Sequence, residues 1–169
     1  MTFSKKSLVG LMLSVAAVSA LVFSLQAGAS RGHHEKHGKL FRSGLVGNAL
    51  ADSPIHGVNR AGAPWVLDKG SVTLSRSGRF ELRVKGLVLA ANGTTGTVTM
   101  IAASFFCAPD SNATAAFTAG PVPLATDGDA RINQNVTLPS RCLAPVVLVR
   151  IQGAAGPGSF IAASGFTTS

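Results

Sequence analysis

Apolar and polar residues alternate along two adjacent stretches of the chain, residues 71–75 and 79–85. In the second stretch Phe80, Leu82 and Val84 point to one side, and charged residues occupy the positions between them. A period of two places alternate side chains on opposite faces of a strand, whereas on a helix it would spread them around the cylinder. The Arg-Ser-Gly sequence between the two stretches is typical of a short turn. The pattern therefore predicts a β-hairpin.

Beyond this hairpin, short apolar runs recur between groups of turn residues. Strand-like patterns cover residues 97–107, 113–118, 130–138, 146–151 and 159–164. Such short strands at regular spacing are typical of an antiparallel sandwich or barrel, and no stretch of this region has the apolar period of an amphipathic helix. We therefore predict one all-β domain over residues 64–166, an antiparallel β-sandwich of about seven or eight short strands. Residues 167–169 form a short tail.

The first 29 residues have the layout of a secretory signal peptide. Lys5 and Lys6 precede an apolar run over residues 8–25, and Ala-Gly-Ala at residues 27–29 supplies the small residues of a cleavage site. This layout predicts export, with the protein secreted or held in the cell envelope and no transmembrane span left after cleavage. The alternative is an uncleaved membrane anchor, because the run is close to the shortest helix that spans a bilayer.

Residues 30–63 are polar, rich in histidine and glycine, and poorly periodic. Their few apolar side chains cannot offset the conformational entropy lost on ordering, so we expect a flexible arm ahead of the domain. His33, His34 and His37 lie close together within this arm. Neutral imidazoles bind copper, zinc or nickel, which makes these three residues candidate metal ligands. The alternative is a solvated leader without a bound metal.

The chain has two cysteines, Cys107 and Cys142, and both follow the predicted signal peptide. An even pair in an exported chain indicates one disulfide. A bond that closes a loop of this length stabilises the fold by about 3–4 kcal/mol in the chain-entropy model. No histidine lies near either cysteine in the sequence and no C-x-x-C motif occurs, so neither a metal site nor a redox role is indicated.

The chain is basic, with a formal net charge of +8. This charge favours acidic partners such as an anionic cell-surface polymer or protein. Arg79, Arg83 and Lys85 share the polar side of one predicted strand and form a candidate anion-binding face; the alternative is that they protect an edge strand from aggregation. Nucleic acid is not expected as a partner, because the chain has no tyrosine and its one tryptophan, Trp65, lies outside this face. Trp65 is expected either in the core or as a platform for a sugar.

No pattern in the sequence indicates a catalytic site or a cofactor. No serine lies in a G-x-S-x-G motif, and His56, the one histidine outside the cluster, belongs to the irregular arm. The titratable residues that an enzyme could use are Asp68, Asp127, Asp129 and Arg131. We therefore expect a non-enzymatic module that binds a surface component or a partner protein. A small secreted enzyme or enzyme inhibitor on the same scaffold is the alternative, because a fold does not decide function.

Four strings of the chain resemble a group of exported bacterial β-rich proteins of unassigned function. They are A-P-W-V-L-D-K-G at residues 63–70, G-D-A-R-I at 128–132, C-L-A-P-V-V-L-V at 142–149 and F-I-A-A-S-G at 160–165. The resemblance covers about residues 63–165. It implies a signal peptide, a cysteine pair and a β-rich domain, and it implies no catalytic residues and no ligand.

Overall fold

The computed structural model describes residues 38–110 and 114–168. The predicted signal peptide, residues 1–29, and the three candidate metal ligands His33, His34 and His37 lie outside these residues. The strands are β1 (Lys39–Gly47), β2 (Trp65–Val66), β3 (Lys69–Ser75), β4 (Arg79–Lys85), β5 (Val88–Leu89), β6 (Met100–Phe106), β7 (Phe117–Pro123), β8 (Ala130–Asn135), β9 (Val146–Gly153) and β10 (Gly156–Ser164). The prediction of an all-β fold is confirmed. Within the described ranges no helix has the length and apolar character needed to cross a membrane.

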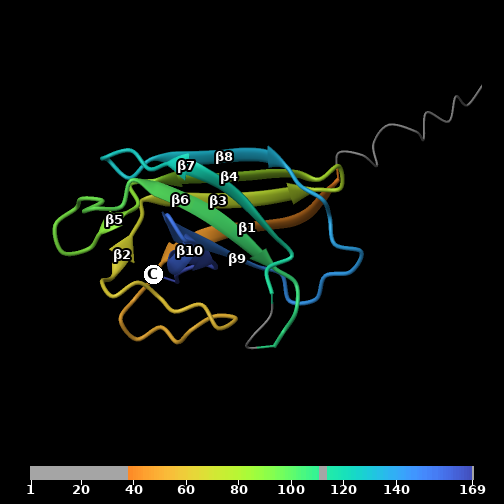
Figure 1. The fold of residues 1–169 in the computed structure, drawn as a ribbon, viewed down its shortest axis with the longest axis horizontal. Coiled ribbons are helices and arrows are strands. Elements are labelled where there is room, and N and C mark those ends of the chain that lie inside the picture. The colour runs from red at the N-terminus through yellow and green to blue at the C-terminus, as the bar shows by residue number, and fades with distance from the viewer. Residues whose placement is uncertain (1–37, 111–113, 169) are drawn as a thin grey trace, which may run out of the picture. The chain divides into compact units, whose positions relative to one another are not determined.

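Eight of the strands form one antiparallel sheet in the order β7-β6-β9-β10-β1-β3-β4-β8, and β2 pairs with β5 in a small second sheet (Figure 1). The first part of β1 pairs with β3, and residues 45–47 pair with β10. The large sheet therefore has two halves that share β1. Its edge strands β7 and β8 come together, and the Gly120 N–H donates to Oε1 of Gln134 at 3.0 Å. The sheet is nearly closed, and both halves contribute to one core.

The inner face of the β3-β4-β8 half contributes a straight row of side chains to the core. Val72 is the direct partner of Leu82, and Leu82 is the direct partner of Ile132. Each of the three side chains is at most 1% exposed. Because side chains alternate between the two faces, a slip of one residue would turn this row to solvent. Burial of the row therefore fixes how the three strands align.

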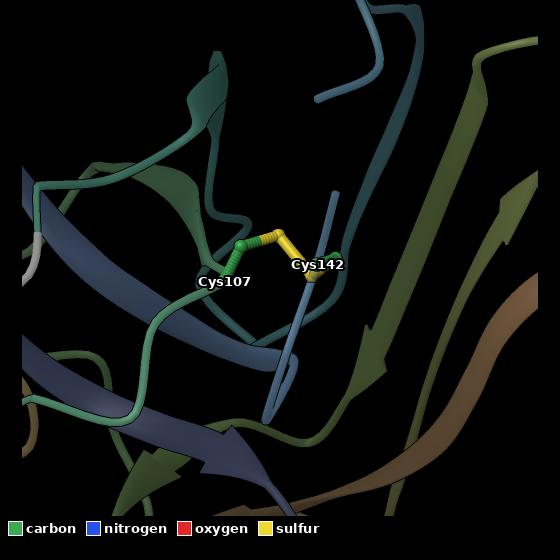
Figure 2. Close-up of a disulfide and its surroundings, with 2 residues drawn as sticks. All are labelled: Cys107 and Cys142. Carbon is green, nitrogen blue, oxygen red and sulfur yellow. A yellow bond between two sulfur atoms is a disulfide. The ribbon is translucent and has the colours of Figure 1, made fainter. Parts of the chain in front are cut away.

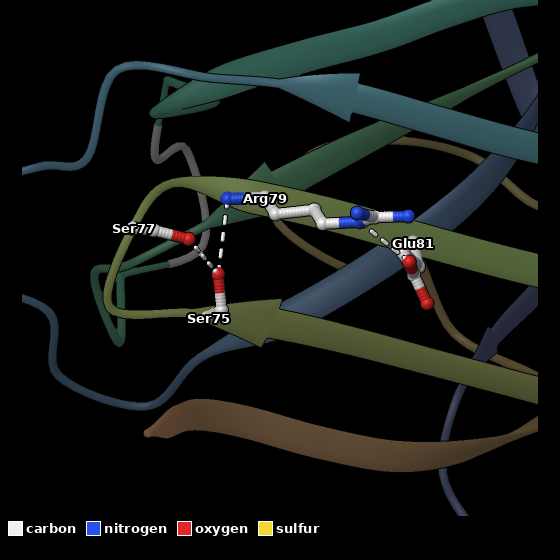
Figure 3. Close-up of polar contacts among 4 residues, drawn as sticks. All are labelled: Ser75, Ser77, Arg79 and Glu81. Atoms are coloured by element: carbon white, nitrogen blue, oxygen red, sulfur yellow. Dashed lines mark hydrogen bonds and ion pairs between the residues drawn. The ribbon is translucent and has the colours of Figure 1, made fainter. Parts of the chain in front are cut away.

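The predicted hairpin is confirmed as β3, a short turn and β4 (Figure 3). Gly78 has a φ of 83°, a conformation that glycine adopts without a steric penalty, and its N–H donates to the Ser75 carbonyl at 3.0 Å. The Ser75 hydroxyl accepts the Arg79 N–H at 3.1 Å and lies 2.7 Å from the Ser77 hydroxyl. The turn residues thus bond to one another and hold the two strands together.

The expectation of a flexible arm over residues 30–63 is wrong for β1. This strand pairs on both sides, and its Leu45 side chain is only 8% exposed. Its inward positions are Phe41, Ser43 and Leu45, so the serine interrupts the apolar alternation that would have indicated a strand. Hydrogen bonds to β3 and β10 hold the backbone in place where side-chain burial is sparse. The domain therefore begins before Pro64.

The chain that follows β1 is also held against the sheet. Asn48 is 3% exposed, and its side-chain amide donates to the carbonyl oxygens of Ala61 at 3.4 Å and Ala63 at 3.1 Å. Its backbone N–H donates to the Ile161 carbonyl at 3.0 Å, and its carbonyl accepts the Trp65 N–H at 3.0 Å. One buried asparagine thus ties the end of β1 to β10, to β2 and to the segment before β2.

Cys107 and Cys142 form the predicted disulfide, with their Cα atoms 4.5 Å apart (Figure 2). The bond joins the end of β6 to the loop between β8 and β9. Next to it, the Leu143 N–H donates to the Cys107 carbonyl at 2.8 Å. A disulfide of this kind is compatible with an extracellular or envelope location.

We predict that Leu45→Ala lowers the free energy of unfolding by about 2–3 kcal/mol, because it leaves a cavity where β1 meets the core. Leu50→Ala is the matched control, since Leu50 lies just after β1 but is 58% exposed, and we expect it to cost less than about 0.5 kcal/mol. Chemical denaturation of both variants measures the difference. Equal and small effects would show that β1 is not an integral part of the domain.

Candidate anion-binding site

The outer face of β3, β4 and β8 carries an open hollow of about 670 Å³. Its lining combines small residues with long cationic ones: Lys69, Gly70, Ser71, Arg83, Val84, Lys85, Asp129, Ala130 and Arg131. Glycine, serine and alanine leave space between the long side chains. We call the four cations of this lining, which are all exposed, the cationic cluster; they are Lys69, Arg83, Lys85 and Arg131.

Strand alignment places the members of the cationic cluster directly opposite one another. Lys69 of β3 is the cross-strand partner of Lys85 of β4, and Arg83 of β4 is the partner of Arg131 of β8. Directly opposed residues have Cβ atoms about 4.5–5.5 Å apart, and like charges at that distance are destabilising. Two such pairs therefore stand side by side on this face.

The hollow has one carboxylate in its lining, Asp129. Its Oδ1 accepts the Gly86 N–H at 3.0 Å, and its Oδ2 lies 3.8 Å from Nζ of Lys85. Both side chains of this pair are substantially exposed, so water screens their attraction. One carboxylate cannot balance four cations, and the hollow keeps an excess of positive charge.

The predicted anion-binding face is divided in the structure. Arg83 and Lys85 lie in the hollow, where Lys69 and Arg131 join them. Arg79 lies outside the hollow lining, at the other end of β4, and its Nε is 2.6 Å from Oε1 of Glu81 (Figure 3). A nearby carboxylate therefore balances the charge of Arg79.

Lys69 and Arg131 were not part of the predicted face, and only Lys69 could have been placed there from the sequence. Once the hairpin turn is located, counting outward from Leu74 and Phe80 brings Lys69 opposite Lys85. The position of Arg131 depends on the pairing of β4 with β8, which are far apart in the chain. No local pattern reports such a pairing.

The other carboxylates named as candidates have local roles or lie outside the hollow. Oδ1 of Asp127 accepts the Asp129 N–H at 3.1 Å. In the same turn the Gly128 N–H donates to the Ala125 carbonyl at 2.8 Å. These bonds are those of an ordinary turn, while Asp68 is exposed and does not line the hollow. Across residues 38–110 and 114–168, no group of three or more His, Cys, Asp or Glu residues could hold a metal ion.

Trp65 and His56 have packing roles. Trp65 is 3% exposed, so its ring belongs to the core and offers no open face for a sugar. His56 stacks on Phe106 with ring centroids 4.8 Å apart, and its Nδ1 lies 2.8 Å from the Asp110 carbonyl oxygen. It therefore helps to hold the segment after β1 against β6.

Arg150 is a further cation that the sequence did not single out. Its Nε donates to the Gly158 carbonyl at 2.7 Å, and its Nη2 donates to the Pro157 carbonyl. Burial lowers the pKa of this guanidinium, because the charged form loses contact with water. The guanidinium remains protonated at neutral pH. Its hydrogen bonds to the Gly158 and Pro157 carbonyls hold the β9–β10 hairpin.

Comparisons of the chain with protein-family models, with curated proteins and with solved structures found no match.

We predict that Arg131→Gln raises stability at low ionic strength by a few tenths of a kcal/mol, because it removes the repulsion between Arg83 and Arg131. The gain should shrink in 0.5 M salt, where exposed charges are screened. Arg79→Gln is the control and should be neutral or slightly destabilising, since it removes the partner of Glu81. Chemical denaturation at both salt concentrations measures the effect. A clear loss of stability in Arg131→Gln would show that Arg131 acts by packing rather than by repulsion.

Proposed function

We propose that this protein is a secreted or envelope-associated, non-enzymatic module that binds an anionic cell-surface polymer in the hollow of β3, β4 and β8. The observation that carries the proposal is the pair of like-charged cross-strand contacts, Lys69 with Lys85 and Arg83 with Arg131. Repulsion of this kind opposes folding and is relieved when anionic groups lie between the cations. Residues of a binding site commonly lower the stability of the folded protein, because they are arranged to contact a ligand.

The chemistry of the cationic cluster favours a polymer with repeated phosphate groups. Arginine presents a planar fork of donors that matches two oxygens of one phosphate, and lysine adds a compact charge. Arg83 and Lys85 are two residues apart on β4, which separates them by about 7 Å along the strand. The two cationic pairs can therefore each hold one anionic group of a chain.

Two general properties support the proposal. Without Lys5 and Lys6 of the predicted signal peptide, the chain carries a formal net charge of +6, which attracts acidic surfaces over a distance. The disulfide between Cys107 and Cys142 is typical of proteins that work outside the reducing cytoplasm. An anionic surface polymer is a partner that a protein in that location meets.

We expect the full chain to bind inorganic polyphosphate at low salt, with an affinity that falls as the salt concentration rises. The double variant Arg83→Gln/Arg131→Gln should bind at least tenfold more weakly, because it removes one of the two cationic pairs. The matched control is Lys39→Gln/Arg76→Gln, which removes two exposed cations that do not line the hollow. Isothermal titration calorimetry at several salt concentrations measures all three proteins.

Comparison of the two double variants distinguishes a specific binding site from a general attraction of the polymer to a basic protein. A site requires the hollow variant to lose much more affinity than the control variant, although both lose the same charge. Equal losses would mean that net charge alone attracts the polymer and that the hollow is not the site. Absence of binding to polyphosphate at low salt would contradict the proposal altogether.

A further inference from the structure

A second cavity of about 290 Å³ opens beside the disulfide. It is lined by Leu40, Phe41, Leu74, Phe105, Leu138, Pro139, Ser140, Arg141, Cys142 and Pro145. Leu74 and Phe105 are each 2% exposed, and Phe41 meets Phe105 edge to face with ring centroids 5.5 Å apart. These residues of β1, β3 and β6 give the cavity an apolar floor. Its volume is just below the usual range of about 300–1,000 Å³ for small-molecule sites.

The polar side chains of this cavity lie in one place. Apart from Cys142, whose sulfur is in the disulfide, only Ser140 and Arg141 interrupt the apolar lining, and they are adjacent in the chain. Ser140 supplies a hydroxyl and Arg141 a guanidinium, and both residues are exposed. Among the ion pairs of the described residues, none involves Arg141. The cavity therefore has an apolar floor and one cationic, hydrogen-bonding side.

The loop that carries this polar side is held in position. The disulfide attaches Cys142 to the end of β6 (Figure 2). The adjacent Leu143 N–H donates to the Cys107 carbonyl at 2.8 Å. Pro139 and Pro145 restrict the backbone on either side of Cys142. A site whose walls are already ordered loses little entropy when a ligand enters.

We propose that this cavity binds a small apolar carboxylate, such as a medium-chain fatty acid. The aliphatic chain lies over Leu40, Phe41 and Leu138, the leucine and phenylalanine side chains of the lining that keep exposed surface. The carboxylate meets Arg141 and Ser140 at the rim. An apolar floor gives affinity through buried methylenes, and a single cation selects an anionic head group over a neutral one. This site is separate from the hollow of β3, β4 and β8, with which it shares no lining residue.

Titration of the full chain with hexanoate, octanoate and decanoate tests the proposal. We expect affinity to rise by up to about fourfold for each added methylene until the cavity is full. The amide signals of residues 140–144 should shift in NMR spectra as decanoate is added. An affinity that is independent of chain length would overturn the proposal, because the floor would then contribute nothing.

Two pairs of variants locate the ligand. Arg141→Gln should weaken decanoate binding by about three- to tenfold and leave decanol binding unchanged, whereas Arg83→Gln in the other hollow should change neither. Leu138→Trp places a large ring in the cavity and should abolish binding. Leu143→Trp adds the same ring at a residue that does not line the cavity and is the matched control. Melting temperatures establish that all variants are folded.

Two further results would each contradict the assignment. One is decanoate binding that survives Leu138→Trp in a folded protein. The other is binding to phosphatidylglycerol vesicles without binding of free decanoate, which would assign this end of the domain to a membrane surface.

Discussion

The alignment of β3, β4 and β8 is the constraint on which the rest of the account depends. Val72, Leu82 and Ile132 are buried in one row, and that row sets which residues of the three strands face one another. The same alignment places Arg83 opposite Arg131 on the outer face. The core does not allow the strands to slide so that the charges separate, because a slip of one residue would expose the apolar row. The like-charged pair is therefore built into the fold.

The second half of the domain depends on β1. This strand leaves β3 and continues along β10, so it carries the sheet around the core. Gly47 shows how closely the chain packs at that point, since a Cβ atom there would overlap the Trp65 carbonyl oxygen. Asn48 follows directly, and its backbone and side-chain hydrogen bonds join three neighbouring segments. The nearly closed sheet thus relies on a segment with little apolar periodicity.

Local patterns predicted those parts of the fold that local physics determines. The hairpin of β3 and β4 follows from a strict alternation and a glycine that adopts a positive φ. The disulfide follows from two cysteines in a chain with the layout of an exported protein. Strand β1 was not predicted from the sequence, because Ser43 occupies an inward position and interrupts the apolar alternation. The strand is held in place by backbone pairing with segments distant in the chain.

The candidate site shows the same division. Alternation along β4 was enough to predict that Arg79, Arg83 and Lys85 share one face. It could not show that Arg131, on a strand distant in the chain, lies opposite Arg83. Charge pairing across a sheet is a property of register between strands, and register between distant strands has no signature in a single sequence.

A double-mutant cycle on Arg83→Gln and Arg131→Gln, measured by denaturation with and without polyphosphate, tests the central claim most directly. Without the polymer, the account predicts that the double variant gains less stability than the sum of the two single variants, because either substitution alone removes the repulsion. With saturating polyphosphate, that unfavourable coupling should vanish or reverse, because the polymer lies between the two charges. Additive effects without polymer, or a coupling that polyphosphate leaves unchanged, would contradict the account.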